Sequence, residues 1–478
     1  MGGHVLVAGF ALSGRAVAAH YAALGVAVRA FDDVDPSSPA ADEMRRTAAL
    51  LGVELELSPG AARLAKLSAG AERVVLSPGL PPFHPVFAAA PRERIVSEVQ
   101  LGAELAEAAG IPLVAVTGTN GKTTVTTLVD AMLRAAGIRS EPAGNIGRPL
   151  VEVASGRRDG SAGRAAERPD VVVVEVSSFQ LSWTTTFSPR VACWLNFAPD
   201  HLDWHRDLAD YAAAKARVWA NQTAGDAAVW YAEDPVVAEA AGRAPGRSVP
   251  FGLRAGEGAY REEGGSLLTS SGEVITTVAD LPRALPHDRA NALAAAACAL
   301  EAGGTLAGCR EALVAGVPMR HRIELVAEEE GGVAWYDDSK ATTPSAVVAA
   351  LTGFPSAVLI AGGRNKGLDL GAVCESLLVE EELGEGPGTG RLRGVVAIGE
   401  AAGEVMAAFS PWAPVEQAGS MDEAVRAAGR LAEPGDAVLL SPGCASFDWY
   451  RSYGERGDDF ARAVRERLAS RTEDRRQT

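Results

Sequence analysis

Cysteine, long apolar runs and excess positive charge are all scarce in this sequence. The five cysteines among 478 residues are widely spaced and form no C-x-x-C pair. This excludes a disulfide framework and argues against a thiolate zinc site. No apolar run approaches the roughly 18 residues that a membrane span needs. Because no targeting segment is visible either, we expect a soluble, cytoplasmic protein.

The net charge of the chain limits the kinds of molecule that it is expected to bind. Lys and Arg number 45 against 61 Asp and Glu, which gives a net charge of −16, and the basic residues form no stripe. Non-specific binding to nucleic acid rests on phosphate neutralisation and is therefore disfavoured. With 47% hydrophobic residues, the 52 glycines and 27 prolines indicate a turn-rich globular protein. We expect a monomer with small-molecule partners and no nucleic-acid or membrane partner.

The first thirty residues predict a βαβ unit. A strand at 5–8, a turn at 9–14, a helix at 15–24 and a strand at 26–31 follow one another. The turn is similar to G-x-G-x-x-G, but Ala11 replaces the middle glycine, and its Cβ would crowd a pyrophosphate. This disfavours NAD and leaves open a nucleotide held less closely or a purely structural turn.

A second strand, glycine loop and helix begin near residue 112. The loop reads Gly-Thr-Asn-Gly-Lys-Thr-Thr over 118–124, between a strand at 112–116 and a helix at 125–136. Glycines let backbone N–H groups surround phosphates, Lys122 adds a point charge, and Thr123 offers a hydroxyl to Mg²⁺. Val116 stands where the strict Walker spacing has glycine, so the loop is a shortened variant. We predict a nucleotide-binding site here.

Further candidates for chemistry lie in the middle of the chain. Glu175 ends a buried run of four valines, where a charge is costly without a partner such as a metal ion. Asp200, His201, Asp203 and His205 form a cluster in which the two histidines would share a face if helical. The H-x-x-x-H spacing is similar to that of zinc sites, but the glutamate of H-E-x-x-H is absent, which disfavours zinc hydrolysis and leaves a solvated loop as an alternative. Lys215 lies on a helix expected over 207–221, where a lysine is normally solvated.

The last third alternates strands and helices again. Strands are expected at 333–336, 357–361, 395–398 and 437–440, and polar turns follow three of them, at 337–342, 362–367 and 441–448. Such turns lie where open α/β sheets place ligands, and they would suit a small acidic ligand. We expect surface loops at 155–169 and 380–390 and a frayed tail at 470–478.

These patterns together predict an α/β protein of three consecutive domains. We expect a Rossmann-like domain over 1–100, a central P-loop ATPase-type domain with a mostly parallel sheet over 101–318, and a second Rossmann-like domain over 319–478.

Four segments resemble the Mur ligase family, most closely its D-glutamate-adding members. They are the loop at 118–124, Glu-Val-Ser-Ser-Phe-Gln-Leu at 175–181, Asp-Ser-Lys-Ala-Thr at 338–342, and 441–450 with Glu-Arg-Gly at 455–457. The Asp-Asn-Pro-Arg signature of the diamino-acid-adding relative is missing. The resemblance covers essentially the whole chain.

The resemblance implies an ATP-dependent, ADP-forming ligase of peptidoglycan biosynthesis. It would join D-glutamate to UDP-N-acetylmuramoyl-L-alanine through an acyl phosphate, using ATP and two Mg²⁺ ions, or Mn²⁺ in their place. Thr123 and Glu175 would hold one ion, and His201 with Lys215 as N6-carboxylysine would hold the other. Two alternatives stay open: a sister ligase with another acceptor, such as L-glutamate, or a non-catalytic nucleotide-binding regulator.

The resemblance also implies a role for each domain and its residues: UDP-substrate binding by 1–100, ATP binding by 101–318 and glutamate binding by 319–478. The residues implied in catalysis are Lys122, Glu175, His201, Lys215 and Lys340. Those implied for ATP are Gly118, Thr119, Asn120, Gly121, Lys122, Thr123, Thr124, Asn291, Arg322 and Asp338. Those implied for the UDP substrate are Leu12, Ser13, Asp32, Ser77, Gly79, Asn145 and His201. Those implied for glutamate are Lys340, Thr342, Lys366, Ser446, Phe447 and Tyr453. Asp288 stands where the family has asparagine near the adenine, and Tyr453 where phenylalanine is common.

Overall fold

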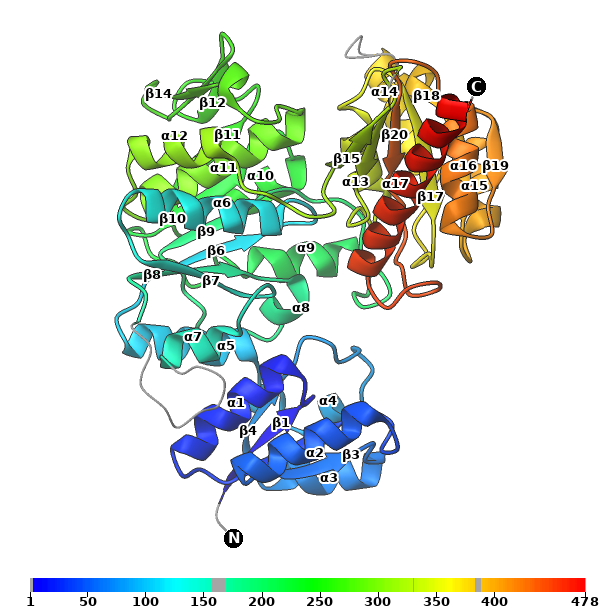
Figure 1. The fold of residues 1–478 in the computed structure, drawn as a ribbon. Coiled ribbons are helices and arrows are strands. Elements are labelled where there is room, and N and C mark those ends of the chain that lie inside the picture. The colour runs from blue at the N-terminus through cyan, green and yellow to red at the C-terminus, as the bar shows by residue number, and fades with distance from the viewer. Residues whose placement is uncertain (1–2, 157–167, 330, 383–387, 478) are drawn as a thin grey trace. The chain divides into compact units, whose positions relative to one another are not determined.

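A computed structural model describes residues 3–156, 168–329, 331–382 and 388–477. It confirms a mixed α/β fold built on three sheets, most of whose strands are parallel (Figure 1). The first sheet has the order β3-β2-β1-β4-β5 and is parallel throughout. Its strands are β1 (His4–Ala8), β2 (Val28–Asp32), β3 (Glu54–Leu57), β4 (Ala71–Leu76) and β5 (Ile95–Ser97). Helices α1 (Leu12–Ala23) and α2 (Pro39–Leu51) pack on one face, α3 (Ala61–Ala69) and α4 (Val86–Ala89) on the other.

The second sheet has the order β14-β13-β12-β11-β10-β9-β6-β8-β7. Its parallel strands are β6 (Leu113–Thr117), β7 (Ser140–Gly144), β8 (Val171–Glu175), β9 (Val191–Trp194), β10 (Ala227–Tyr231), β11 (Arg247–Gly252) and β12 (Tyr260–Glu263). Antiparallel strands β13 (Ser266–Leu268) and β14 (Val274–Thr277) extend one edge.

Helices cover both faces of this second sheet. One face packs against α6 (Lys122–Ala135), α11 (Pro286–Glu301) and α12 (Leu306–Ala315), and the other against α5 (Glu98–Ala108), α7 (Leu150–Ser155) and α10 (Pro235–Ala241). The valine run in β8 follows from this layering, because Val171 and Val173 enter one core and Val172 and Val174 the other. Two short helices, α8 (Ser178–Leu181) and α9 (Leu208–Ala216), follow strand ends.

The third sheet has the order β15-β16-β20-β17-β18-β19, and only β15 is antiparallel. Its strands are β15 (Glu324–Glu328), β16 (Ala334–Asp337), β17 (Ala357–Gly362), β18 (Leu392–Ile398), β19 (Val415–Gln417) and β20 (Ala437–Leu440). Helices α13 (Pro344–Leu351), α14 (Ala372–Glu382) and α15 (Ala402–Phe409) pack on one face, α16 (Met421–Leu431) and α17 (Tyr453–Gln477) on the other.

The chain forms two compact units. The first comprises residues 1–197, 204–284 and 288–317 and carries the first two sheets. The second comprises residues 198–203, 285–287 and 318–478 and carries the third sheet. The three-domain boundaries at residues 100 and 318 stay a prediction.

Several local expectations need correction. The tail expected to fray from residue 470 is helical to Gln477. Of the surface loop expected at 380–390, residues 380–382 are the last of α14 and residues 388–390 belong to a 3₁₀ helix (Gly388–Arg391), while the residues between them lie outside the described part of the chain. The helix expected over 207–221 ends at Ala216. Residues 201 and 205 are not helical, so the shared helical face does not form. Most of the loop expected at 155–169 lies outside the described residues.

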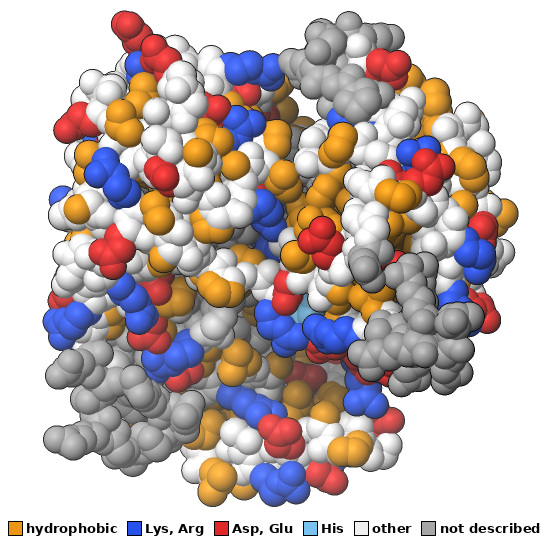
Figure 2. Space-filling view, turned by 45° about the horizontal axis from the view of Figure 1, so that its top comes forward, with side chains coloured by type: hydrophobic (Ala, Val, Ile, Leu, Met, Phe, Trp, Pro, Cys, Tyr) orange, Lys and Arg blue, Asp and Glu red, His pale blue; other side chains and the backbone are white. Residues whose placement is uncertain are grey.

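The length and apolarity of the helices, and the charge on one face of the surface, are the features relevant to membrane spans and charged patches. None of the helices within the described part of the chain combines the length and apolarity that crossing a membrane requires. On the face shown in Figure 2, basic and acidic side chains are interspersed.

A buried carboxylate at the start of α5 makes stability depend on pH. Glu98 is 1% exposed, and its Oε1 accepts a hydrogen bond from the Val151 backbone N–H at 2.7 Å. Burial raises the pKa of Glu98 to about 7. The folded protein therefore binds more protons than the unfolded chain between the unfolded-state pKa and about pH 7, and the free energy of unfolding falls as pH rises through that window.

We expect Glu98→Gln to remove this dependence. The free energy of unfolding of the variant minus that of wild type should be about 2 kcal/mol larger at about pH 8 than at about pH 5.5, because only the wild type ionises a buried group in this range. Denaturant unfolding of both proteins at the two pH values measures the difference. If the stability difference between the two proteins were the same at both pH values, the pKa of Glu98 would not be raised in the folded protein.

Candidate active site

The phosphate loop joins the end of β6 to the start of α6. Gly121 precedes the helix at φ +82°, where a side chain is strained, and a Cβ there would lie 2.6 Å from Asn291 Oδ1. The glycine thus lets the loop and α11 approach each other closely. The structure brings Asn291, which the resemblance implies for ATP, against the loop, and the N-terminus of α6 favours an anion there.

Asn196 fixes the shape of this loop, and sequence reasoning missed it. Its Oδ1 accepts hydrogen bonds from the backbone N–H groups of Thr119 at 3.1 Å and Asn120 at 2.9 Å, and its Nδ2 donates to Asn120 O at 3.2 Å. The available signal was position: Asn196 follows β9, the strand that pairs with β6. Polar residues directly beyond such strand ends are candidates for a site.

Two lysines converge on one carbonyl of the loop. Gly118 O accepts a hydrogen bond from Lys122 Nζ at 2.9 Å and from Lys215 Nζ at 2.7 Å. Lys215 is only 1% exposed, and its Nζ lies 4.5 Å from the centroid of the Tyr211 ring. Lys215 is therefore not solvated, whereas a lysine on an amphipathic helix normally is. The buried Nζ of Lys215 lies directly against the phosphate loop.

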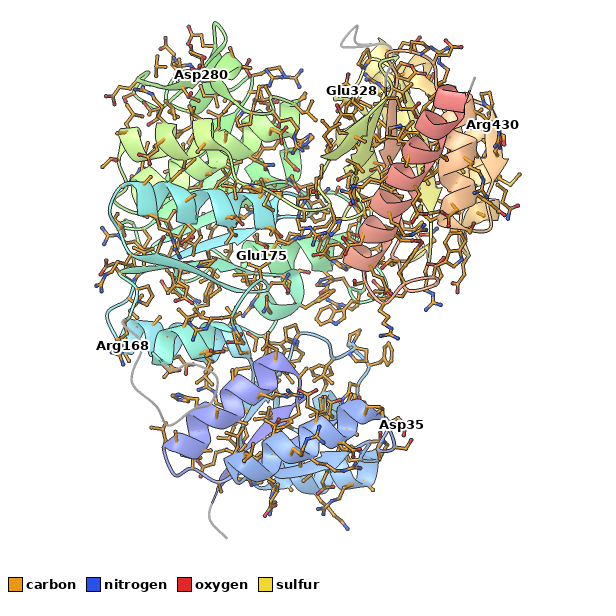
Figure 3. All side chains as sticks on the ribbon, viewed as in Figure 1. Asp35, Arg168, Glu175, Asp280, Glu328 and Arg430 are labelled. Atoms are coloured by element: carbon orange, nitrogen blue, oxygen red, sulfur yellow. The ribbon has the colours of Figure 1, made fainter. Side chains whose placement is uncertain are left out.

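Glu175 lies beside the same loop with an unsatisfied oxygen. Glu175, labelled in Figure 3, pairs in register with Val116 of β6. The residue is 2% exposed. Its Oε1 accepts a hydrogen bond from Asn145 Nδ2 at 2.8 Å, while its buried Oε2 has no hydrogen-bond partner among the described residues. Mg²⁺ takes carboxylate and hydroxyl oxygens, so Glu175 with Thr123, at the first turn of α6, fits a metal site.

The predicted UDP-substrate residues of the first sheet gather at the carboxyl ends of its strands. Asp32 accepts from the Phe10 N–H at 2.6 Å and the Val34 N–H at 3.0 Å, and Ser77 Oγ donates to Gly9 O at 2.9 Å. Leu12 is 62% exposed at the start of α1, followed by Ser13, and Gly79 is exposed after β4. The strand ends of β1, β2 and β4 thus bring these residues to one edge.

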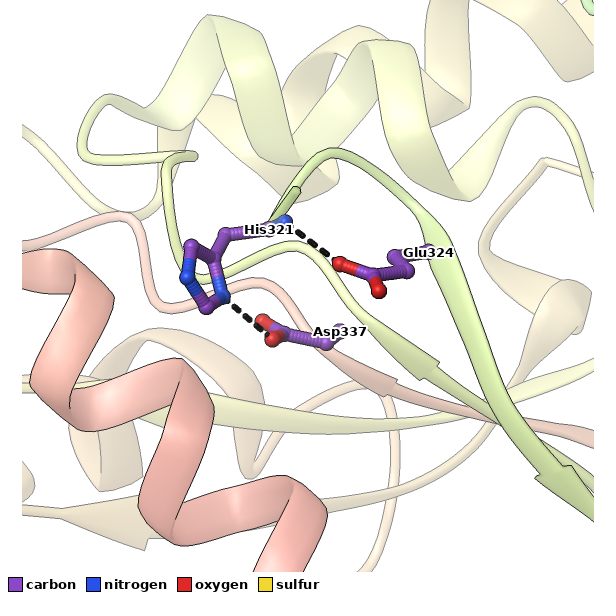
Figure 4. A group of neighbouring side chains, drawn as sticks. All are labelled: His321, Glu324 and Asp337. Atoms are coloured by element: carbon purple, nitrogen blue, oxygen red, sulfur yellow. Dashed lines mark hydrogen bonds and ion pairs between the residues drawn. The ribbon is translucent and has the colours of Figure 1, made fainter. Parts of the chain in front are cut away.

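In the second unit, a network missed by sequence reasoning holds Arg322. Its neighbours His321 and Ile323 have φ values of +61° and +48°, which are strained for these residues. His321 Nδ1 is hydrogen-bonded to Asp337 Oδ2 at 2.7 Å, and the His321 backbone N–H donates to Glu324 Oε2 at 2.9 Å. Dashed lines mark both contacts in Figure 4. Burial raises the pKa of Asp337. These bonds over-determine the strained segment and so fix the backbone on both sides of Arg322.

Asp338 lies next to this network. Its Oδ2 accepts a hydrogen bond from Ser441 Oγ at 2.8 Å, across the neighbouring strands β16 and β20. Burial raises the pKa of Asp338 to about 7, against the opposing effect of the Arg322 charge. Arg322 and Asp338 therefore lie close enough to influence each other, and their role in ATP binding stays a prediction.

Five of the six predicted glutamate residues lie in loops beyond β16, β17 and β20, and the sixth, Tyr453, begins α17. Lys340 Nζ lies 5.2 Å from the centroid of the Tyr453 ring, Thr342 is half-buried, and Ser446 is buried beside the exposed Phe447. Lys366 Nζ lies 3.9 Å from Asp200 Oδ1.

Not every predicted group lies in one unit. His201, with φ +56° and its Nε2 3.2 Å from Asp200 Oδ2, belongs to the second unit, whereas Lys215 belongs to the first. Asn291 likewise belongs to the first unit, and Arg322 with Asp338 to the second. Asp288 forms two hydrogen bonds of 2.7 Å with the Arg283 guanidinium.

Comparisons with known proteins agree on one family. Residues 116–299 match the Mur ligase middle domain, and residues 321–444 match the domain described as Mur ligase, glutamate ligase domain. A UDP-N-acetylmuramoylalanine--D-glutamate ligase of Frankia casuarinae is 42% identical over 482 residues, covering 97% of this chain and 94% of that protein. One of Rubrobacter xylanophilus is 43% identical over 438 residues, covering 89% and 91%. A solved MurF ligase of Thermotoga maritima in complex with ADP has a TM-score of 0.59 at 16% identity, over 93% of this chain and 96% of that one, and shares the fold.

Proposed function

Because the chain belongs to the Mur ligase family of ATP-dependent, ADP-forming amide ligases, we propose that it adds D-glutamate to UDP-N-acetylmuramoyl-L-alanine in peptidoglycan biosynthesis. One structural observation carries the proposal: Lys122 and the buried Lys215 converge on Gly118 O beside the unsatisfied Glu175. A protein that only bound nucleotide would not require a buried lysine and a buried carboxylate at one phosphate loop. The enzyme acts in the cytoplasm as a monomer.

The first step is phosphoryl transfer from ATP. An oxygen of the alanine carboxylate attacks the γ-phosphorus, the bond from that phosphorus to the β,γ-bridging oxygen breaks, and ADP leaves as the acyl phosphate forms. The protein's part is to position and neutralise charge. The loop N–H groups and Lys122 hold the phosphates, and Asn291, Arg322 and Asp338 bind the nucleotide.

Two Mg²⁺ ions would supply further neutralisation of the phosphate charges. Thr123 and Glu175 would hold one, which fits the buried, unpartnered Oε2 of Glu175. His201 and Lys215 would hold the other. Lys215 fits this role as a carbamate: its neutral Nζ attacks the carbon of CO₂, an N–C bond forms, a proton leaves, and the lysine ends in a carboxylate, a ligand type that a hard cation accepts.

The second step is amide formation. The amino nitrogen of glutamate attacks the carbonyl carbon of the acyl phosphate, the C–O bond to phosphate breaks, phosphate leaves, and the nitrogen loses a proton. Lys340, Thr342 and Lys366 hold the reacting amino acid, and Ser446, Phe447 and Tyr453 receive its side-chain carboxylate. Domain 319–478 binds glutamate, domain 101–318 binds ATP, and domain 1–100 binds the UDP substrate through Leu12, Ser13, Asp32, Ser77 and Gly79. Asn145 and His201 complete the path of that substrate.

A comparison of acceptors tests this function. We expect phosphate release from ATP, with UDP-N-acetylmuramoyl-L-alanine and Mg²⁺, only when D-glutamate is added, and not with L-glutamate, glycine or meso-diaminopimelate. Product mass confirms the amide. Release with another acceptor would favour a sister ligase, and nucleotide binding without turnover would favour a regulator.

A further inference from the structure

Arg456 is a buried arginine for which the proposed mechanism has no role. It lies in the first turn of α17 and is 1% exposed. Its Nε donates to Ser339 Oγ at 2.9 Å, and its Nη2 to Ser339 O at 2.8 Å. Nη1 and Nη2 both donate to Cys444 O at 3.1 Å. The guanidinium thus bonds to two backbone carbonyls and one hydroxyl.

The charge of Arg456 has no ion-pair partner among the residues that the structure describes. The carboxylates that influence it, of Asp337 and Asp448, lie beyond ion-pair distance. Burial lowers the pKa of Arg456 to about 10, so the group remains charged near neutral pH. A buried cation without a counter-ion is costly, and an anion that binds nearby recovers part of that cost.

Arg456 lies where three neighbouring strands end. Ser339 follows β16 and Cys444 follows β20. Gly363 follows β17 and lies so close to the arginine that a Cβ on it would be 3.1 Å from Nη1. The same Cβ would lie 2.3 Å from Ala445 O, so only glycine permits this approach. The backbones of Arg364 and Ala445 bond to each other at 2.8 and 3.0 Å.

The three loops that meet at Arg456 carry the residues proposed to bind glutamate. Lys340 is the immediate neighbour of Ser339, Lys366 lies three residues beyond Gly363, and Ser446 lies two beyond Cys444. The arginine is therefore hydrogen-bonded to two of these loops, through Ser339 and Cys444, lies against the third at Gly363, and is a fixed positive charge behind them. In a protein interior, such a charge acts over several ångströms.

We propose that Arg456 is a positioning residue that sets the affinity for the dicarboxylate acceptor, by bonding to the loops after β16 and β20, by packing against the loop after β17, and by placing behind them a positive charge that has no ion-pair partner among the described residues. The inference rests on the proposed function, since it takes glutamate as the acceptor. It predicts that loss of the charge weakens acceptor binding more than it slows the chemical steps or weakens ATP binding.

Steady-state kinetics of Arg456→Gln, with Arg456→Lys beside it, test this inference. We expect the glutamine variant to raise KM for D-glutamate about 10- to 100-fold, with kcat and KM for ATP each within about 3-fold of wild type. Arg456→Lys keeps the positive charge but lacks the planar guanidinium group, so the KM of this variant for D-glutamate should stay within about 5-fold of wild type. Arg462→Gln is the matched control on the same helix, because Arg462 is 41% exposed and pairs with Asp422 and Asp459, and its kinetics should not change.

Other outcomes would overturn the proposal. If Arg456→Gln lowers kcat and raises every KM together, and lysine does no better, the arginine only maintains the fold. If the glutamine variant does not fold, a lysine variant whose KM for D-glutamate rises more than about 10-fold contradicts the charge role. A wild-type enzyme that does not use D-glutamate overturns the proposed function, and this inference with it.

Discussion

Glu175→Gln should lower turnover by at least about 10³-fold while the protein stays folded. The substitution keeps an oxygen that can accept the hydrogen bond from Asn145 Nδ2 and removes only the charge. The lost charge matters because the other oxygen, Oε2, is buried and has no hydrogen-bond partner among the described side chains and backbone. A neutral amide is a weaker ligand for Mg²⁺ than a carboxylate. We therefore expect loss of metal affinity rather than loss of structure.

Two readouts separate the metal role from a structural one. Binding of Mn²⁺ in the presence of ADP, followed by electron paramagnetic resonance, should weaken at least about 10-fold in Glu175→Gln, whether or not the enzyme turns over. Glu98→Gln is the matched control: Glu98 lies in the same unit, is 1% exposed, and also has a buried Oε2 with no hydrogen-bond partner among the residues that the structure describes. It should keep wild-type activity and Mn²⁺ affinity. Unchanged Mn²⁺ binding by Glu175→Gln would remove Glu175 from the metal site.

The fold was accessible to sequence reasoning wherever a pattern is local. The strand at residues 437–440 was predicted with its observed bounds, and the run of four valines before Glu175 is a buried strand, as expected. Both are buried from two sides and flanked by turn residues. The phosphate loop was equally legible because its strand, glycines and helix are contiguous. The tail after residue 470 was missed because its charged sequence has no apolar face to mark it as part of α17.

The parts of the site that escaped prediction depend on contacts between distant segments. Asn196 holds a loop that lies 76 residues earlier in the chain. His321 is bonded to Asp337, and the pattern around either residue alone is that of an ordinary polar turn. The hydrophobic periodicity of a sequence does not indicate that a particular asparagine side chain will accept hydrogen bonds from two N–H groups of a distant loop. Lys215 shows the same limit, since its helix looks solvated until β6 and the loop are placed against it.

Lys215→Ala should abolish turnover, with a loss of at least about 10³-fold, and short carboxylates should restore part of it. The side chain is 1% exposed, so its removal leaves a cavity beside Gly118 O that acetate or formate could enter. If the working group is the Nζ carbamate, a small carboxylate in that cavity supplies the same ligand chemistry. Activity of the variant at increasing acetate, measured as phosphate release, should rise and saturate.

The carbamate itself has a readout independent of activity. Wild type equilibrated with ¹³C-labelled bicarbonate should show one protein-bound carbamate resonance, and Lys215→Ala should lack it. Lys66→Ala serves as the control, because Lys66 lies exposed on α3 and its loss should change neither the resonance nor the activity. Since a buried ammonium beside Gly118 O could instead act directly on the phosphates, two results would count against the carbamate: no resonance in active wild type, or a variant with full activity. A rescue by methylamine but not by acetate would assign the role to the ammonium.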